Sequence, residues 1–269
     1  MIKLMLITDN PQFAIRAENC GVDRIFLDLE YINKAERQKG RNTYITRNSV
    51  EDVTPLRNVI KKSELLVRVN PINSGSKMEI DEICRRGADI IMLPMVYDAD
   101  EVKRFTELVD GRAKTMPMIE TAAAFARLDD ILEVEGVDEI FVGLNDLHIS
   151  FKLNFMFEPL ADGLIDIVSS KCKAANIPFG FGGLAKIGEG MLPAEYILGE
   201  HYRLASSSVI LSRTFRNETG TGDASPVNLE EEIAKIRRQE KIISGWDKSQ
   251  YEENRLRVKN IVKDIVGRA

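Results

Sequence analysis

Short apolar runs alternate with longer segments of helical period along most of this 269-residue chain. A short apolar run bounded by polar or glycine-rich turns is typical of a buried strand. Strands that alternate with helices pair in parallel, so the pattern predicts an α/β fold. Eight runs fit this description: residues 3–7, Arg24–Leu29, Glu64–Asn70, Asp89–Leu93, Lys114–Ile119, Asp138–Val142, Ile177–Gly182 and Ala205–Leu211.

Eight strand-helix units are the pattern of a (β/α)8 TIM barrel, in which chemistry collects at the carboxyl ends of the strands. The alternative is an open, doubly wound sheet. That fold binds dinucleotides on a glycine-rich turn after its first strand, whereas Thr8-Asp9-Asn10-Pro11 stands there in this chain. The sequence therefore favours the barrel. Helices are predicted at Gln12–Asn19, Ser49–Lys62, Lys77–Arg86, Ala99–Val109, Ala122–Glu133, Leu160–Ala175 and Pro193–Tyr202.

The end of the chain differs in pattern from the repeat. Residues 1–216 are predicted to form the barrel, and residues 217–226, which are polar and rich in glycine, a linker loop. Residues 227–269 are almost entirely helical in pattern and exceed what a barrel needs. We expect this C-terminal helical extension to pack on a neighbouring subunit or to seal the bottom of the barrel.

Composition narrows the class of protein. A net charge of -5 and a pI near 5.4 argue against a nucleic-acid binder, which normally carries a basic stripe. No apolar run approaches the roughly 18 residues of a membrane span. The N-terminal apolar run lacks a signal-peptide cleavage site, and the three cysteines suit a reducing compartment. These features predict a cytoplasmic protein with no nucleic-acid or membrane partner.

Glu120 and Asp146 each lie just after a predicted strand, and the two strands follow one another in the chain. Because the carboxyl ends of parallel strands meet at one end of a barrel, the two carboxylates are expected to share one space. Carboxylate oxygens, completed by water and substrate oxygens, are the ligands that Mg²⁺ prefers. Both acids also suit the first turn of a helix, where the dipole favours negative charge, so spacing alone leaves both interpretations open.

Arg68 is the most informative of the other residues at strand ends. A guanidinium on a buried strand can hold a substrate carboxylate with two hydrogen bonds. The alternative is an internal salt bridge to Glu30 or Glu120. Asn70 follows Arg68, and Asn145 precedes Asp146, so both are candidates for substrate binding.

Glycines and a histidine complete the set of candidates. Gly182, with its neighbours Gly180 and Gly183, lets the backbone approach a ligand, or simply makes a tight turn. His148 follows Asp146 on a predicted loop, where it is either a base or a surface residue, while His201 is predicted to be structural. The segment Lys34–Arg47, rich in lysine and arginine, is either a solvated loop or a lid that attracts an anion.

Five blocks in order make the chain recognisable: Asp28–Glu30, Arg68–Pro71, Gly87–Pro94, Pro117–Thr121 and Ile131–Leu147. Over roughly residues 1–215 the sequence resembles the HpcH/HpaI aldolase and citrate lyase β-subunit superfamily, whose members are phosphoenolpyruvate/pyruvate-type TIM barrels. The resemblance implies that Glu120 and Asp146 bind Mg²⁺ or Mn²⁺. It also implies that Arg68 binds the carboxylate of a small anionic 2-oxo acid, and that the chain forms a homo-oligomer, a trimer or hexamer.

Tyr31 departs from the family pattern. The aldolases of the family carry a histidine immediately after the glutamate of the first block, and the citrate lyase branch carries an aspartate. The residue after Glu30 in this chain is Tyr31. Tyr31 could serve as a phenolic acid or base, and otherwise a metal-bound water, Glu30 or His148 would do so.

The leading hypothesis is a divalent-metal-dependent carbon-carbon lyase or aldolase that cleaves or forms a small 4-hydroxy-2-oxo acid through a pyruvate enolate. No lysine ends a predicted strand beside the acids, which disfavours a Schiff-base aldolase. One alternative is cleavage of an acyl thioester, as in citrate or malyl-CoA lyases. The other is a metal-binding barrel without lyase activity, which acts as a binding or assembly component.

Overall fold

Eight parallel strands close into a single barrel in the computed structural model, which describes residues 1–33, 48–216 and 227–268. Each strand pairs with the next, and β8 returns to pair with β1. The predicted TIM barrel is thus confirmed. The strands are β1 (Lys3–Ile7), β2 (Arg24–Asp28), β3 (Glu64–Arg68), β4 (Ile90–Leu93), β5 (Lys114–Ile119), β6 (Ile140–Val142), β7 (Phe179–Leu184) and β8 (Ser208–Leu211).

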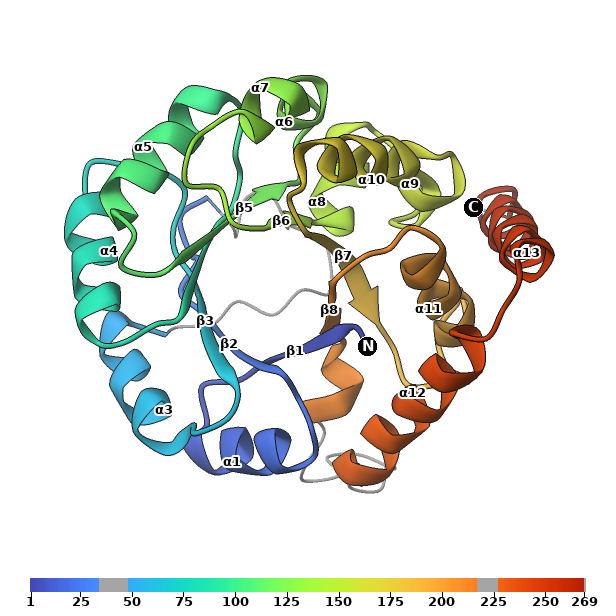
Figure 1. The fold of residues 1–269 in the computed structure, drawn as a ribbon, viewed down its shortest axis with the longest axis horizontal. Helices are drawn as coiled ribbons and strands as arrows, with labels where there is room; N and C mark the ends of the chain where they lie inside the picture. The colour runs from blue at the N-terminus through green and yellow to red at the C-terminus, as the bar shows by residue number, and fades with distance from the viewer. Residues whose placement is uncertain (34–47, 217–226, 269) are drawn as a thin grey trace.

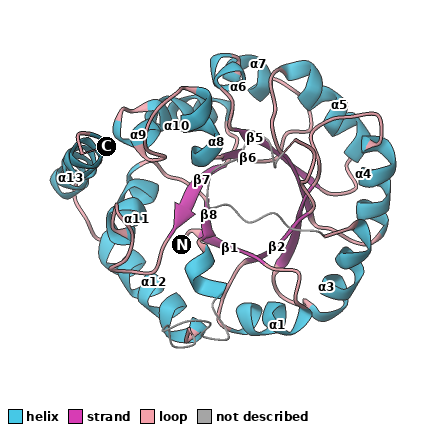
Figure 2. Cartoon of the chain, turned by 180° about the vertical axis from the view of Figure 1, so that it is seen from behind, coloured by secondary structure: helices cyan, strands magenta, loops and turns pink. Residues whose placement is uncertain are grey.

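Helices surround the strands on all sides (Figures 1 and 2). The helix α12 lies in this ring between α11 and α1, and α13 lies outside α11 (Figure 1). Among the described residues the helices are α1 (Pro11–Asn19), η1 (Val50–Asp52), α3 (Val53–Val59), α4 (Ser76–Arg85), α5 (Ala99–Val109), α6 (Ala122–Ala126), α7 (Leu128–Leu132), α8 (Leu144–Ser150), α9 (Glu158–Ala161), α10 (Leu164–Ala175), α11 (Ala194–Arg203), η2 (Arg213–Arg216), α12 (Leu229–Ile243) and α13 (Lys248–Val266).

Three local predictions were wrong, and one of them is the helix expected at Ala122–Glu133, which is divided at Arg127 into α6 and α7. The residues after β6 were expected to form a loop, but Leu144–Ser150 form the helix α8. The helix expected at Leu160–Ala175 is split into α9 and α10, because Gly163 adopts a left-handed φ of 85° between them. The predictions for Lys34–Arg47 and for the linker at 217–226 lie outside the described residues.

The core has two layers on either side of the strands. Side chains that point into the barrel form a small cluster, which includes Met5, Phe26, Met92, Met116 and Phe141. Alternate positions on the same strands face outward and join the helices in a much larger cluster. This two-sided burial explains why the strands read as continuous apolar runs in the sequence.

Charged residues close the amino-terminal end of the barrel. Arg24 has no exposed surface; it donates two hydrogen bonds to Glu139 and a third to Glu64. Nearby, Glu240 of α12 accepts a hydrogen bond from the amide of Ile2, at 2.7 Å. This hydrogen bond ties the helix α12 to the start of β1. The division of the chain into barrel, linker and tail stays a prediction.

His201 is structural in its surroundings, as the sequence suggested. It is fully buried in α11 and stacks on Phe181, with ring centroids 3.8 Å apart. Its Nδ1 lies 2.9 Å from the hydroxyl of Ser206. Burial lowers the pKa of His201 to about 3, so the ring is neutral at ordinary pH.

Within the described residues, no helix is long and apolar enough to cross a membrane.

Replacing Glu139 by alanine is expected to destabilise the fold by about 3–5 kcal/mol, because it leaves the buried Arg24 guanidinium without its main partner. Urea unfolding monitored by circular dichroism measures this. The matched control is Glu253→Ala, which breaks an exposed pair with Arg257 and should change stability by less than about 1 kcal/mol. Equal effects of the two substitutions would contradict the role given to Arg24.

Candidate active site at the carboxyl ends of the strands

An ion pair between neighbouring strands forms one wall of the site. Asp28 and Arg68 are direct partners in the register of β2 and β3. Nε and Nη2 of Arg68 donate to the two carboxylate oxygens of Asp28, at 2.9 and 2.8 Å. Glu30 lies 3.4 Å from the same Nη2. The guanidinium is thus held rigidly by two acids.

The partner of Arg68 differs in part from the expectation. The sequence suggested a salt bridge to Glu30 or Glu120; the structure contains the pair with Glu30, but the forked partner is Asp28. Burial works against the charge of Arg68, but the nearby acids Asp28, Glu30 and Glu120 raise its pKa above the ordinary value. Successive side chains of a strand point to opposite faces, so Asp28 and Glu30, two residues apart, start from the same face. This signal in the sequence was overlooked.

Glu120 ends β5 and is almost completely buried. Its Oε1 accepts a hydrogen bond from the amide of Met95, at 2.8 Å. Its other oxygen faces Gly143, where any side-chain carbon would collide with the carboxylate. Burial, together with the charges of Asp146 and Glu30, raises the pKa of Glu120 to about 8, although Arg68 acts in the opposite direction.

Asp146 lies in the first turn of α8, directly after β6. Its charge acts on Glu120, so the two carboxylates lie within electrostatic reach of each other. The capping interpretation fails for Glu120, because Thr121 is the residue that caps the next helix, by accepting a hydrogen bond from Ala124. The carboxylate of Glu120 is left to face the mouth of the barrel.

His148 is buried in α8, and its Nδ1 lies 3.3 Å from the carbonyl oxygen of Leu144. Residues two apart on a helix point to opposite faces, so His148 and Asp146 start in opposite directions. The histidine was expected on a loop, which the structure contradicts. Asn145 is partly buried beside Asp146 in the first turn of the same helix.

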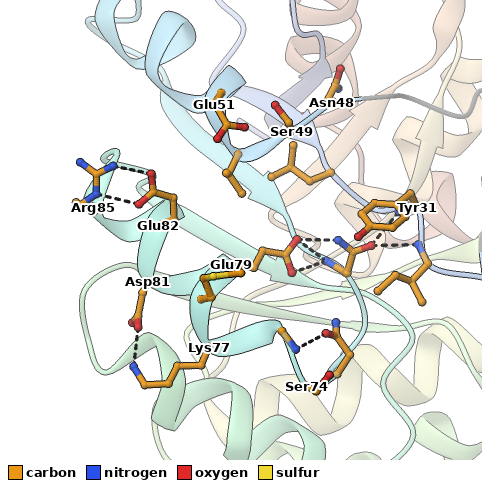
Figure 3. Close-up of a pocket in the computed structure, with 17 residues that line it drawn as sticks. Tyr31, Asn48, Ser49, Glu51, Ser74, Lys77, Glu79, Asp81, Glu82 and Arg85 are labelled. Carbon is orange, nitrogen blue, oxygen red and sulfur yellow. Dashed lines mark hydrogen bonds and ion pairs between the residues drawn. The ribbon is translucent and has the colours of Figure 1, made fainter.

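Tyr31 is one of the more exposed large side chains, with 62% of its surface accessible. It lines a cavity of about 1000 Å³ between η1 and α4 (Figure 3). Arg68, Glu120 and Asp146 are not among the described residues that line this cavity. The ring of Tyr31 therefore faces a different space from the acids.

Asn70 lines the same cavity as Tyr31. Its Oδ1 accepts hydrogen bonds from the amides of Tyr31 and Ile32, at 3.0 and 3.1 Å, and its Nδ2 donates to Glu79 at 2.7 Å (Figure 3). The amide group is thus engaged with the protein itself. Gly182 also has an internal explanation, since its φ is 59° and an added Cβ would lie 2.8 Å from Leu144.

A divalent cation fits the chemistry of this site. Three acids, Asp28, Glu30 and Glu120, act on the guanidinium of Arg68, and the charges of Asp146 and Glu30 raise the pKa of Glu120. Such an excess of negative charge in a buried space is relieved by a cation. No group of three or more potential ligand side chains occurs in the described part of the chain, so water and substrate oxygens would complete a shell begun by Glu120 and Asp146.

Residues 2–176 match the family described as HpcH/HpaI aldolase/citrate lyase. No curated protein matches the chain. Among solved structures, an HpcH/HpaI aldolase from Desulfitobacterium hafniense DCB-2 is 16% identical, with a TM-score of 0.61, and the match covers 82% of this chain and 91% of that one. A family protein from Burkholderia cenocepacia J2315 is 18% identical, with a TM-score of 0.61 and coverage of 78% and 87%. The citrate synthase SbnG is 15% identical, with a TM-score of 0.62 and coverage of 79% and 87%.

The stability of the metal-free protein is expected to fall as the pH rises from about 4.5 to about 8. Glu120 has a higher pKa in the folded chain than its ordinary 4.5, so the folded state binds more protons in this window and loses that advantage as Glu120 ionises. The isosteric substitution Glu120→Gln removes the charge. It should stabilise the metal-free protein at pH 8 by roughly 2–4 kcal/mol.

Urea unfolding in the presence of a chelator, between pH 5 and 8, measures this difference. Added MgCl2 should stabilise the wild type and have less effect on the Gln variant. Glu252→Gln, on the exposed face of α13, is the control and should follow the wild type. Parallel pH profiles for the wild type and Glu120→Gln would show that Glu120 carries no unfavourable charge.

Proposed function

Because the chain belongs to the HpcH/HpaI aldolase/citrate lyase family, we propose that it is a divalent-metal-dependent carbon-carbon lyase that acts on a small 4-hydroxy-2-oxo acid. The observation that carries the proposal is the pairing of Glu120 with Asp146 beside Arg68. The family is typically dependent on divalent metals. A cation and a guanidinium at one barrel mouth suit a substrate with two neighbouring anionic or carbonyl oxygens.

Glu120 and Asp146 would hold Mg²⁺ or Mn²⁺. When bound, the cation would supply Lewis-acid stabilisation of the negative charge that develops on the 2-oxo group. Glu120 is oriented for this role by the amide of Met95 on one side and by the narrow space at Gly143 on the other. Hydrogen bonds of this kind fix a metal-ligating carboxylate and tune its affinity.

Arg68 would bind the carboxylate of the substrate. Asp28 occupies the Nε and Nη2 edge of the guanidinium and Glu30 lies 3.4 Å from Nη2, so the substrate carboxylate would meet Nη1. On that side Nη1 lies 3.8 Å from the sulfur of Met118. Because Asp28 fixes the plane of the guanidinium, little side-chain entropy is lost when the substrate binds.

Glu30 is the acid best placed to move a proton. It lies beside Arg68, whereas the ring of Tyr31 faces the separate cavity and His148 starts from the opposite face of α8. In cleavage, the carboxylate of Glu30 would take the proton of the 4-hydroxyl group while the C3–C4 bond breaks. The electron pair of that bond becomes the C2–C3 double bond of pyruvate enolate, and the C4 fragment leaves as an aldehyde.

With Mg²⁺ or Mn²⁺, the wild type is expected to exchange the methyl protons of pyruvate with deuterated water, because enolate formation is the half of the reaction that needs no aldehyde. Proton NMR follows the exchange directly. Glu120→Ala should reduce the metal-stimulated rate about 100-fold or more, since it removes a ligand that positions the cation. The exposed substitution Glu252→Ala is the control.

Exchange that is absent with either metal, together with no pyruvate release from a panel of 4-hydroxy-2-oxo acids, would overturn the lyase proposal. In that case metal binding without turnover would support a binding or assembly role for the barrel. Release of an acyl group from a thioester in place of an aldehyde would instead identify the citrate lyase-like reaction.

A second pair of variants tests the base. Glu30→Gln is expected to slow cleavage about 100-fold or more, the usual range for loss of a general base, whereas Tyr31→Phe should change kcat less than about threefold. Steady-state kinetics with a cleavable substrate give both values. A large loss in Tyr31→Phe with little loss in Glu30→Gln would transfer the role to the phenol.

A further inference from the structure

The loop between β4 and α5 contains a residue in an uncommon backbone conformation. Met95 has a φ of 53°, in the left-handed region. Asparagine, aspartate and glycine enter this region readily, but an unbranched apolar residue seldom does so. A residue is kept in such a conformation only where its surroundings hold it, and such residues concentrate at functional sites.

The conformation of Met95 places its amide against the site. The N–H group donates to Oε1 of Glu120, at 2.8 Å. The next residue in the loop is held as well, because the hydroxyl of Thr121 donates to the carbonyl oxygen of Val96, at 2.7 Å. Two adjacent residues at the end of β5 therefore hold two adjacent residues of the loop after β4.

The anchors of this loop are rigid. Leu93 and Pro117 are partners in the register of β4 and β5, and Pro94 and Val96 are buried. With both flanks fixed, a return of Met95 to negative φ would turn the peptide planes around it. The amide would then no longer point at Glu120, whose other oxygen lies close to the backbone of Gly143.

We infer that Met95 is a positioning residue for Glu120, and that it acts through its backbone amide and left-handed conformation, with Thr121 holding the loop in place. This inference rests on the proposed role of Glu120 as a metal ligand. The side chain of Met95 would be replaceable, whereas the left-handed conformation of its backbone would not. Substitutions of Met95 should therefore rank in Mn²⁺ affinity by how readily the new residue adopts a left-handed φ. An ordinary packing role would not produce this order.

Met95→Asn and Met95→Val form the test pair. Asparagine adopts the left-handed region readily, whereas a β-branched valine is strongly disfavoured there. We expect Met95→Asn to bind Mn²⁺ within about threefold of the wild type, and Met95→Val to bind it at least about tenfold more weakly. Electron paramagnetic resonance of free Mn²⁺ measures the affinity without turnover.

Thr121→Val and Thr121→Ser give an independent comparison in case Met95→Val does not fold. Valine keeps the branched shape of threonine but lacks the hydroxyl, whereas serine loses the methyl group but keeps the hydroxyl that donates to Val96. Mn²⁺ affinity should fall in Thr121→Val and be restored in Thr121→Ser. Thermal unfolding of each variant, followed by circular dichroism, shows that the compared proteins are folded at the temperature of the titration.

Equal Mn²⁺ affinities for Met95→Asn and Met95→Val, with normal binding by the wild type, would overturn the inference alone. A side-chain role for Met95 would give the opposite order, because valine preserves apolar packing better than asparagine. If the wild type bound no Mn²⁺, the proposed function would fail, and the positioning role would fail with it.

Discussion

The balance of buried charge at the mouth of the barrel is the constraint on which the site depends. Asp28 neutralises Arg68 through a forked pair, and Glu30 adds a second acid to the same guanidinium. The pKa of Glu120 nevertheless rises to about 8, because its burial and the charges of Asp146 and Glu30 outweigh the effect of Arg68. A buried carboxylate in this position is stabilised by a proton or by a nearby cation, and without either its charge lowers the stability of the fold.

The opposite end of the barrel shows what the same residue types do when charge is balanced. Lys3, Arg24 and Lys114 meet Glu64 and Glu139 in one network. Three cations there face two acids, and Lys114 and Arg24 lower the pKa of Glu64 to about 2, against the effect of burial. One end of the barrel is thus closed by satisfied ion pairs, whereas the other keeps an excess of acids. This asymmetry agrees with the general location of chemistry at the carboxyl ends of barrel strands.

Much of this could be predicted from the sequence, because local patterns encode it. The eight strands were recognisable from apolar runs, and Glu120, Asp146 and Arg68 from their places at strand ends. The helix α8 was missed because its seven residues, which begin directly after Gly143, show too little periodicity to separate helix from loop. Met95 was missed for another reason: its role lies in a backbone torsion, and no residue type in Leu-Pro-Met-Val signals a left-handed φ.

Tyr31 shows how neighbouring residues in a strand end can serve different spaces. Glu30 is buried beside Arg68, whereas Tyr31 is exposed and faces the cavity between η1 and α4. The side chain of Asn70 holds the backbone of Tyr31 at this cavity, because it accepts a hydrogen bond from the amide of Tyr31 and donates one to Glu79. The residue that departs from the family pattern therefore leaves the charged groups of the mouth intact. Under the proposed function Glu30 would move the proton, so a change at the position of Tyr31 would leave the proposed cation ligands untouched.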